Sequence, residues 1–220
     1  MTRKMINTMG AERKRGFIYT GGEIYAENVT EKPEKDDFCI AADSGYKTAR
    51  ALGARIDVVI GDFDSLGDVS IPSGIERIDL PAEKDCTDTQ AAVQVALERG
   101  CTEIYIIGGI GTRIDHVLSN VGILEGLYEG GVHAYITNGK NRIRYIRNDN
   151  VLIGRSAYKY LSVIALDPVC KGVSVEGCKY KMKNQKLERK VQFAVSNEIE
   201  GNLALVTVKK GAALVIESMD

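Results

Sequence analysis

Short apolar runs that end in glycine or aspartate alternate with longer amphipathic segments between Arg15 and about residue 140. Short runs bounded by turn residues are typical of buried strands, and the longer segments have helical spacing. The alternation predicts β-α units around a mostly parallel sheet. The expected strands are Gly16–Thr20, Phe38–Ala42, Val58–Ile60, Glu76–Leu80, Ile104–Ile107 and His133–Thr137. The expected helices are Tyr46–Leu52, Thr87–Arg99 and Ile114–Glu129.

The last of these helices has an apolar stripe that we expect to pack on the sheet. The stripe consists of Ile114, Val117, Leu118, Val121, Leu124 and Leu127.

The pattern changes after Asn141 to short alternating or β-branched runs, separated by turns rich in glycine, asparagine and lysine. Strands at such short intervals are typical of an all-β sandwich or barrel. The expected strands are Tyr160–Ala165, Gly172–Val175, Lys190–Val195, Ala204–Val208 and Ala213–Ile216. The sequence therefore predicts an N-terminal Rossmann-like α/β domain over residues 1–140 and a C-terminal all-β sandwich domain over residues 141–220.

Composition narrows the classes of protein. The 29 Lys and Arg residues nearly balance the 30 Asp and Glu residues, so the net charge of −1 gives no overall attraction to nucleic acid or anionic membranes. No apolar run approaches the roughly 18–20 residues of a membrane span, and the basic N-terminus lacks the apolar region of a secretory signal. The five cysteines are scattered without a C-x-x-C pair. We expect a cytoplasmic protein without disulfides, a zinc site, or a nucleic-acid or membrane partner.

Candidate chemistry lies in three polar clusters at strand ends or helix starts. Gly61–Ser65 follows a predicted strand, Asp85–Gln90 opens a predicted helix, and Gly108–His116 joins a strand to a helix. Asp43, at the end of another strand, is a weaker fourth candidate. Because ligands of doubly wound sheets bind at the carboxyl ends of the strands, these clusters predict a common binding site.

The paired aspartates Asp62 and Asp64 suggest a cation. Two carboxylates 4 Å apart repel by about 4 kcal/mol at an effective dielectric constant near 20, so a proton or a hard cation must offset the charge. Mg²⁺ prefers a few carboxylates together with substrate phosphates. Glycine turns and helix N-termini donate N–H groups to phosphate oxygens, and Arg113 adds a charged fork. Together the features predict a metal–nucleotide site.

Each cluster also has a structural explanation. The paired aspartates suit a turn after a strand, and Thr87 with Gln90 has the spacing of a capping box. The glycine segment is a poor dinucleotide fingerprint because Ile114 stands where the third glycine belongs. His116 suits a hydrogen-bonded structural residue. The functional interpretation therefore depends on the clusters occurring together.

Taken together, the clusters resemble the thiamine pyrophosphokinase family. That family has a G-D-F-D-S turn, a D-x-T-D-x-x helix start and a G-G-x-G-x-R-x-D-H segment, which match Gly61–Ser65, Asp85–Gln90 and Gly108–His116 in order. Asn120 stands where the family often has asparagine, and Asp43–Gly45 resembles its upstream D-x-G turn. The family's architecture, an α/β nucleotide-binding domain followed by a β-sandwich, agrees with the change of pattern near residue 141.

The resemblance implies transfer of the pyrophosphoryl group of Mg-ATP, the co-substrate, to the hydroxyethyl oxygen of thiamine, with release of AMP. By position it assigns Mg²⁺ binding to Asp62, Asp64, Asp85 and Asp88. It assigns catalysis to Asp62, Asp64, Asp88, Arg113 and Asp115. It assigns cofactor and substrate binding to Asp43, Gln90, Gly109, Gly111, Arg113, Asn120, Ser196 and Asn197.

The resemblance also implies a homodimer whose sites lie between the α/β domain of one chain and the β domain of the other. In the family a Ser-Asn pair of the β domain helps to hold thiamine, and Ser196–Asn197 matches it. This chain departs from some relatives because it contains no tryptophan. Phe193 or a tyrosine must therefore take the place of an indole if a ring stacks on thiamine.

Three alternatives stay open from the sequence. The first is the same transfer onto another hydroxymethyl heterocycle, such as a dihydropterin. The second is a phosphatase of the haloacid-dehalogenase type with Asp62 as nucleophile, although the sequence has no obvious downstream lysine and paired-aspartate cluster for it. The third is a non-catalytic nucleotide or metabolite sensor on the same fold.

Overall fold

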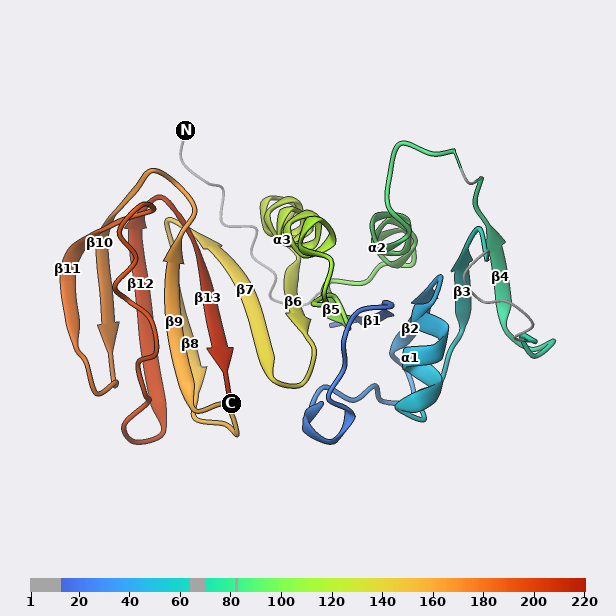
Figure 1. Ribbon diagram of the computed structural model, residues 1–220, viewed down its shortest axis with the longest axis horizontal. Coiled ribbons are helices and arrows are strands. Elements are labelled where there is room, and N and C mark those ends of the chain that lie inside the picture. The colour runs from blue at the N-terminus through green and yellow to red at the C-terminus, as the bar shows by residue number, and fades with distance from the viewer. Residues whose placement is uncertain (1–12, 64–69, 82) are drawn as a thin grey trace.

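The computed structural model describes residues 13–63, 70–81 and 83–220 as two sheets and three α-helices (Figure 1). The strands of the large sheet are β1 (Arg15–Tyr19), β2 (Phe38–Ala42), β3 (Val58–Gly61), β4 (Glu76–Asp79), β5 (Glu103–Ile107), β6 (His133–Thr137), β7 (Asn141–Arg147), β9 (Tyr160–Ala165) and β13 (Ala212–Ser218). The small sheet contains β8 (Asn150–Gly154), β10 (Val169–Glu176), β11 (Met182–Glu188) and β12 (Leu203–Lys210). The helices are α1 (Gly45–Ala51), α2 (Asp88–Glu98) and α3 (Ile114–Glu129), and a short 3-10 turn covers Ala26–Asn28.

The large sheet is parallel over most of its width. Its order is β4-β3-β2-β1-β5-β6-β7-β13-β9, and the pairs from β4 to β6 are all parallel. The pairs from β6 through β7 and β13 to β9 are antiparallel. The coarser part of the predicted fold, an α/β chain with a large, mostly parallel sheet followed by a separate antiparallel sheet, is therefore confirmed.

The chain changes direction across the sheet at β1. It adds β2, β3 and β4 on one side of this strand, returns, and adds β5 and β6 on the other side. The connections that follow β1 and β5 therefore lead toward opposite edges of the sheet, and open α/β sheets bind ligands at such a point.

The alternation of side chains along the strands builds a separate core on each face of the sheet. Phe17 and Tyr19 of β1 pack with α1 on one face. Ile18 of the same strand packs on the other face, in the core to which α2 and α3 contribute. No helix in the described ranges is long and apolar enough to cross a bilayer.

The small sheet packs against the antiparallel strands of the large sheet. Val163 and Val215 of the large sheet are buried with Val173 and Val206 of the small one in a third core. The large sheet itself continues past residue 140, because β6 and β7 pair in antiparallel fashion through Ile136 and Ile143.

One predicted strand is wrong and three strands were not predicted. Residues 190–195 form an irregular segment along β9, where the Gln192 side chain bonds to the backbone N–H and C=O of Ala165 at 3.2 and 3.1 Å. The unpredicted strands are β7, β8 and β11. β7 and β11 contain many charged and polar residues, and β11 lies at the edge of its sheet, so their apolar pattern is weak.

The apolar stripe of α3 is buried only in its second half. Leu124 and Leu127 are buried as predicted, whereas Ile114 and Leu118 are 64% and 65% exposed. The first fully buried residue of the helix is Asn120. The first turns of α3 therefore leave apolar side chains on the surface of this chain.

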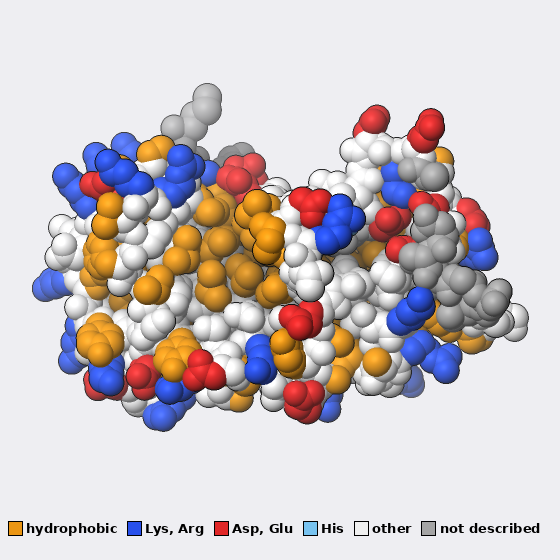
Figure 2. Space-filling view, in the orientation of Figure 1, with side chains coloured by type: hydrophobic (Ala, Val, Ile, Leu, Met, Phe, Trp, Pro, Cys, Tyr) orange, Lys and Arg blue, Asp and Glu red, His pale blue; other side chains and the backbone are white. Residues whose placement is uncertain are grey.

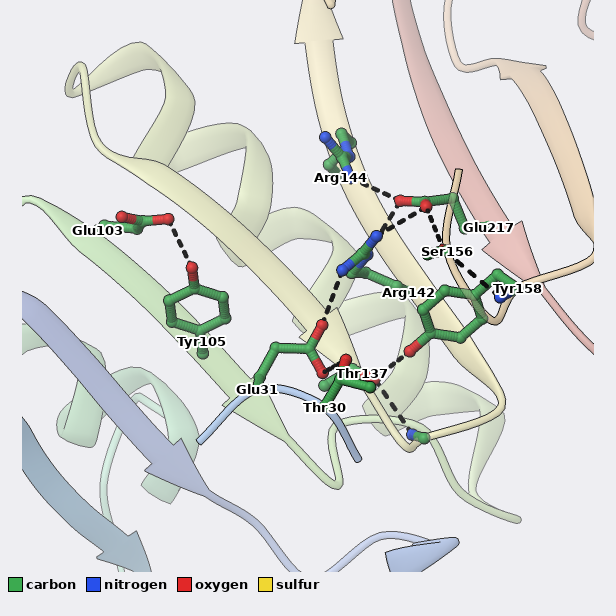
Figure 3. A network of polar contacts seen from close by, with 11 residues as sticks. Thr30, Glu31, Glu103, Tyr105, Thr137, Arg142, Arg144, Ser156, Tyr158 and Glu217 are labelled. Carbon is green, nitrogen blue, oxygen red and sulfur yellow. Dashed lines mark hydrogen bonds and ion pairs between the residues drawn. The ribbon is translucent and has the colours of Figure 1, made fainter. Parts of the chain in front are cut away.

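A buried charge network joins β7, β13 and the loop after β1 (Figure 3). The Glu217 carboxylate, 2% exposed, accepts hydrogen bonds from Arg142 at 2.7 and 2.9 Å and from Arg144 at 2.5 Å. Arg142 also donates to the Glu31 carboxylate at 2.9 Å. Since buried charges are tolerated only when they are paired and hydrogen-bonded, these residues fix the loop against the sheet.

We expect Glu217→Gln to lower the free energy of unfolding by about 3 kcal/mol, because it removes the carboxylate charge that two largely buried guanidinium groups share and leaves Arg142 with Glu31 alone. Urea denaturation at neutral pH measures the change. The matched control is Glu188→Gln, which removes the partner of the 83% exposed Lys190 and should cost less than about 1 kcal/mol. Equal losses in the two variants would show that the network adds no stability.

Candidate functional site

A polar cavity of about 340 Å³ lies where the carboxyl ends of β1, β2 and β5 meet. The residues from Thr20 to Gly22 follow β1, those from Ala42 to Ser44 follow β2, and the glycine-rich turn follows β5. The first residues of α2 and the first turns of α3 complete the wall. Figure 2 shows acidic and basic side chains gathered on this face near α3 and α2.

Glycines bring the loops after β1 and β5 into backbone contact. The Gly22 N–H donates to the Gly108 carbonyl at 2.9 Å, and a Cβ on Gly22 would lie 2.1 Å from that oxygen. Gly108 has a φ of 80°, and its own Cβ would lie 2.7 Å from the Thr20 carbonyl oxygen. The Asn120 amide donates to the Gly109 carbonyl at 2.8 Å and fixes the turn from the side of α3.

The sequence prediction locates part of this cavity and misses part of it. Of the predicted residues, the cavity is lined by Asp43, Asp88, Gly109, Gly111, Arg113 and Asn120. The loop after β1 was not predicted, although the Gly-Gly pair at residues 21–22 follows a strand just as the pair at residues 108–109 does. That parallel was the available signal.

The start of α2 has a structural explanation as well as a place in the cavity. Gln90 N–H donates to the Thr87 hydroxyl at 3.2 Å, and Thr87 N–H donates to the Gln90 side-chain oxygen at 2.8 Å. This is the complete capping box that the spacing allowed. Gln90 does not line the cavity, whereas Asp88, the next residue after the cap, does.

The acidic cluster contains a lysine that the sequence analysis did not single out. Lys84 Nζ lies 3.1 Å from Asp88 Oδ1 and 4.0 Å from Asp62 Oδ2, and 13% of its side chain is exposed. Burial lowers the pKa of the Lys84 ammonium, but the neighbouring Asp88 and Asp62 carboxylates outweigh burial and raise it. Lys84 therefore stays charged and draws the two carboxylates toward one point.

The donor set fits Mg²⁺ held jointly with a phosphate ligand. Within the described ranges no three His, Cys, Asp or Glu residues converge as a closed metal cage. Asp64 lies outside these ranges, and Asp85 is exposed and does not line the cavity. Asp88 Oδ1 is buried and accepts no well-aligned hydrogen bond from the described residues. Two carboxylates that approach the same ammonium would suit Mg²⁺ in its place, because Mg²⁺ completes its shell with phosphates and water.

The start of α3 presents an exposed ion pair. The Arg113 guanidinium contacts the Asp115 carboxylate at 2.6 Å, and both side chains are well exposed. The hydrogen bond from Arg113 lowers the pKa of Asp115, and a bond from the His116 N–H acts in the same direction. Arg113 and His116 line the cavity and Asp115 does not, so the guanidinium is placed for an anion at the helix N-terminus.

Ser196 and Asn197 lie away from this cavity. Asn197 is buried, and its amide binds the backbone of Tyr180 in both directions, accepting from N–H at 2.9 Å and donating to C=O at 2.7 Å. It lines a second cavity of about 180 Å³ together with Tyr180 and Phe193. Ser196 has a φ of 54°, and its N–H donates to the Ser162 hydroxyl. Of these two predicted residues, Asn197 lines the second cavity and Ser196 lines neither cavity.

Two family models match adjacent parts of the chain. The model described as "Thiamin pyrophosphokinase, catalytic domain" matches residues 30–136, which include most of the polar cavity. The model described as "Thiamin pyrophosphokinase, vitamin B1 binding domain" matches residues 141–213, which include Asn197 and the second cavity.

Individual relatives agree over both parts. The chain is 26% identical to thiamine pyrophosphokinase of Bacillus subtilis over 209 residues, which covers 93% of this chain and 98% of the relative. A crystal structure of the Bacillus subtilis thiamine pyrophosphokinase has a TM-score of 0.83 at 23% identity and covers 94% of this chain and 100% of that one. A thiamin pyrophosphokinase family protein from Enterococcus faecalis has a TM-score of 0.78 at 27% identity, with 95% and 100% covered.

We expect Gly108→Ala to lower the free energy of unfolding by about 2 kcal/mol, because a left-handed backbone and a close carbonyl both oppose a Cβ there. The control is Gly122→Ala in α3, where a Cβ would meet nothing within 4 Å. That change should stabilise the protein by up to about 1 kcal/mol, since alanine favours a helix. Thermal unfolding of both variants measures the two shifts, and a stable Gly108→Ala variant would contradict the close packing of the loops.

Proposed function

The chain belongs to the thiamin pyrophosphokinase family, and on that premise we propose that it transfers the pyrophosphoryl group of Mg-ATP to the hydroxyethyl oxygen of thiamine. The products are thiamine diphosphate and AMP. The observation that supports this proposal best is the polar cavity, most of which lies within the part that the catalytic model matches. It combines glycine turns, two helix N-termini and the Asp88 carboxylate, and the Lys84 ammonium beside it links Asp88 to Asp62, which does not line the cavity itself.

The residues of the cavity have complementary tasks in this reaction. The N–H groups of the glycine turns and the starts of α2 and α3 bind phosphate oxygens. Asp62 and Asp88 would hold Mg²⁺, with Asp64 and Asp85 as further ligands assigned by sequence alone. The metal ion supplies charge neutralisation on the phosphates when it is bound. Arg113 adds a second positive charge, and Asp115 beside it orients the guanidinium or contacts thiamine.

The transfer itself is mostly a matter of position and charge. The hydroxyethyl oxygen of thiamine forms a bond to the β-phosphorus of ATP. The bond between that phosphorus and the oxygen bridging to the α-phosphate breaks, and AMP leaves with this oxygen. The hydroxyl proton passes to an aspartate of the cluster late in the transition state, so no strong base is needed.

A homodimer is part of the proposal, because Asn197, assigned to thiamine by the resemblance, lines a cavity of the same chain separate from the polar one. An apolar surface supports this. Ile114 and Leu118 of α3 are exposed, and Ile164 of β9 and Ile216 of β13 are only partly buried. Figure 2 shows hydrophobic side chains gathered over β9 and β13 beside α3. A second copy that covered this surface would bring its β domain toward the first chain's cavity.

The cytoplasm is the proposed location. All five cysteines are free, and four of them are buried as ordinary core residues. Chains that depend on no disulfide are typical of reducing compartments.

The rival acceptor and the rival enzyme class have less support. A dihydropterin acceptor would not explain why residues 141–213 match a vitamin B1-binding domain. A phosphatase with Asp62 as nucleophile would leave the glycine turns and the start of α3 without a role. Thiamine and ATP therefore remain the proposed substrates.

We expect the purified protein with Mg-ATP to produce AMP and thiamine diphosphate only when thiamine is present. Phosphorus NMR distinguishes the outcomes, because ADP would indicate monophosphoryl transfer and free phosphate a phosphatase. AMP formed with a pterin alcohol but not with thiamine would show that the acceptor is a pterin. Asp88→Asn should lower kcat at least about 100-fold while circular dichroism stays unchanged, because it removes a charge that neutralises and positions the reacting groups.

Leu118→Glu should convert the dimer to a monomer and abolish thiamine diphosphate formation, because it places a charge in the proposed apolar contact. Analytical ultracentrifugation measures the first effect. The control is Leu152→Glu on β8, where the side chain is also 64% exposed but lies on the small sheet. If the Leu118 variant sediments like the unaltered protein, the surface beside α3 is not the interface.

A further inference from the structure

Lys84 lies in the segment that leads into α2, with its ammonium between two carboxylates of the candidate metal site. Nζ is 3.1 Å from Asp88 Oδ1 and 4.0 Å from Asp62 Oδ2. The same ammonium donates to the Pro81 carbonyl at 3.4 Å. Only 13% of the side chain is exposed, so this lysine is not an ordinary solvated surface charge, for which ion pairs contribute little.

Toward the two carboxylates Lys84 supplies charge, and its hydrogen bond goes to the Pro81 carbonyl. Asp88 Oδ1 lies near the ammonium but accepts no well-aligned hydrogen bond from the residues described. A lysine ammonium is a compact point charge on a flexible stem, unlike the rigid fork of arginine. Such a group can offset the repulsion between two carboxylates, and it can leave them by giving up the single 3.4 Å hydrogen bond to Pro81.

A divalent cation and an ammonium cannot share the space between Asp62 and Asp88. The repulsion between the two cations is stronger where water is excluded, and the Lys84 side chain is largely buried. A metal ion that binds both carboxylates must therefore displace the Lys84 ammonium. Asp88 contacts Lys84 and also lines the polar cavity, so the displaced ammonium has a short path to an anion bound there.

We propose that Lys84 is a tethered counter-charge, which occupies the position between Asp62 and Asp88 until Mg-ATP arrives and then turns toward the triphosphate. This inference rests on the proposed function for the identity of the metal and the nucleotide. Lys84 is a positioning residue in this account. It keeps the affinity for free metal low, so that metal and nucleotide enter together, and it adds a positive charge to the bound phosphates.

The proposal predicts opposite changes in two affinities when the charge is removed. Lys84→Met keeps most of the length of the stem and leaves the carboxylates uncompensated. The affinity of the protein for Mn²⁺ alone, without nucleotide or thiamine, should rise at least fivefold in an EPR titration. The affinity for ATP in the presence of Mg²⁺ should fall at least fivefold in calorimetry. A purely structural lysine would lower both affinities or change neither.

Matched variants make the outcome specific. Lys84→Arg keeps the charge and should bind Mn²⁺ as the unaltered protein does. Lys190→Met removes the exposed partner of Glu188 and should also leave the Mn²⁺ affinity unchanged. Adding Asp88→Asn to Lys84→Met should abolish the gain, because it removes one of the two carboxylates. Lys84→Gln serves as a second neutral variant if circular dichroism shows that the methionine variant is misfolded.

Mn²⁺ affinity that stays unchanged or falls in a folded neutral variant overturns the role of Lys84. That result is independent of the reaction, because the titration contains no substrate. Absence of thiamine-dependent AMP would instead overturn the proposed function and would leave the metal titration meaningful. The two failures are therefore distinguishable.

Discussion

The position of β1 between β2 and β5 is the constraint on which the site depends. Parallel strands place their carboxyl ends at one edge of a sheet, and the connections after β1 and β5 lead from there toward opposite sides of the strand order. Backbone contact between the loops after β1 and β5 then requires residues without side chains, as Gly22 and Gly108 show. Helices that start at the same edge point their N–H groups into the opening.

Charge balance explains the rest of the cavity. Carboxylates that converge near a helix start need a cation, and in this chain Lys84 occupies the position between Asp62 and Asp88. Arg113 lines the cavity and is exposed, paired with Asp115. Positive charge therefore lies on the cavity wall at Arg113 and next to Asp88 at Lys84, which suits a polyanion that enters together with a metal ion.

The continuity of the large sheet connects the two parts of the chain. β7 and β13 extend the same sheet that holds the cavity, and the buried Glu217 carboxylate joins them through Arg142 and Arg144. The residues around Asn197 are thus held at a fixed place on the far side of this junction, in a cavity of their own. Their separation from the polar cavity is a property of the single chain, and it is the physical reason that a second copy enters the proposed function.

The sequence by itself determined the parallel α/β half and most of the polar cavity, because apolar periodicity and turn residues are local signals. Strands such as Phe38–Ala42 and helix Ile114–Glu129 agree with the structure at both ends, and the capping box of Thr87 and Gln90 is formed as its spacing allowed. Only the tertiary structure decided which residues meet. The ammonium of Lys84, in the segment before α2, contacts Asp62 at the end of β3, and the burial of Glu217 depends on two arginines far away in sequence. Such contacts join residues distant along the chain and leave no periodic pattern in it.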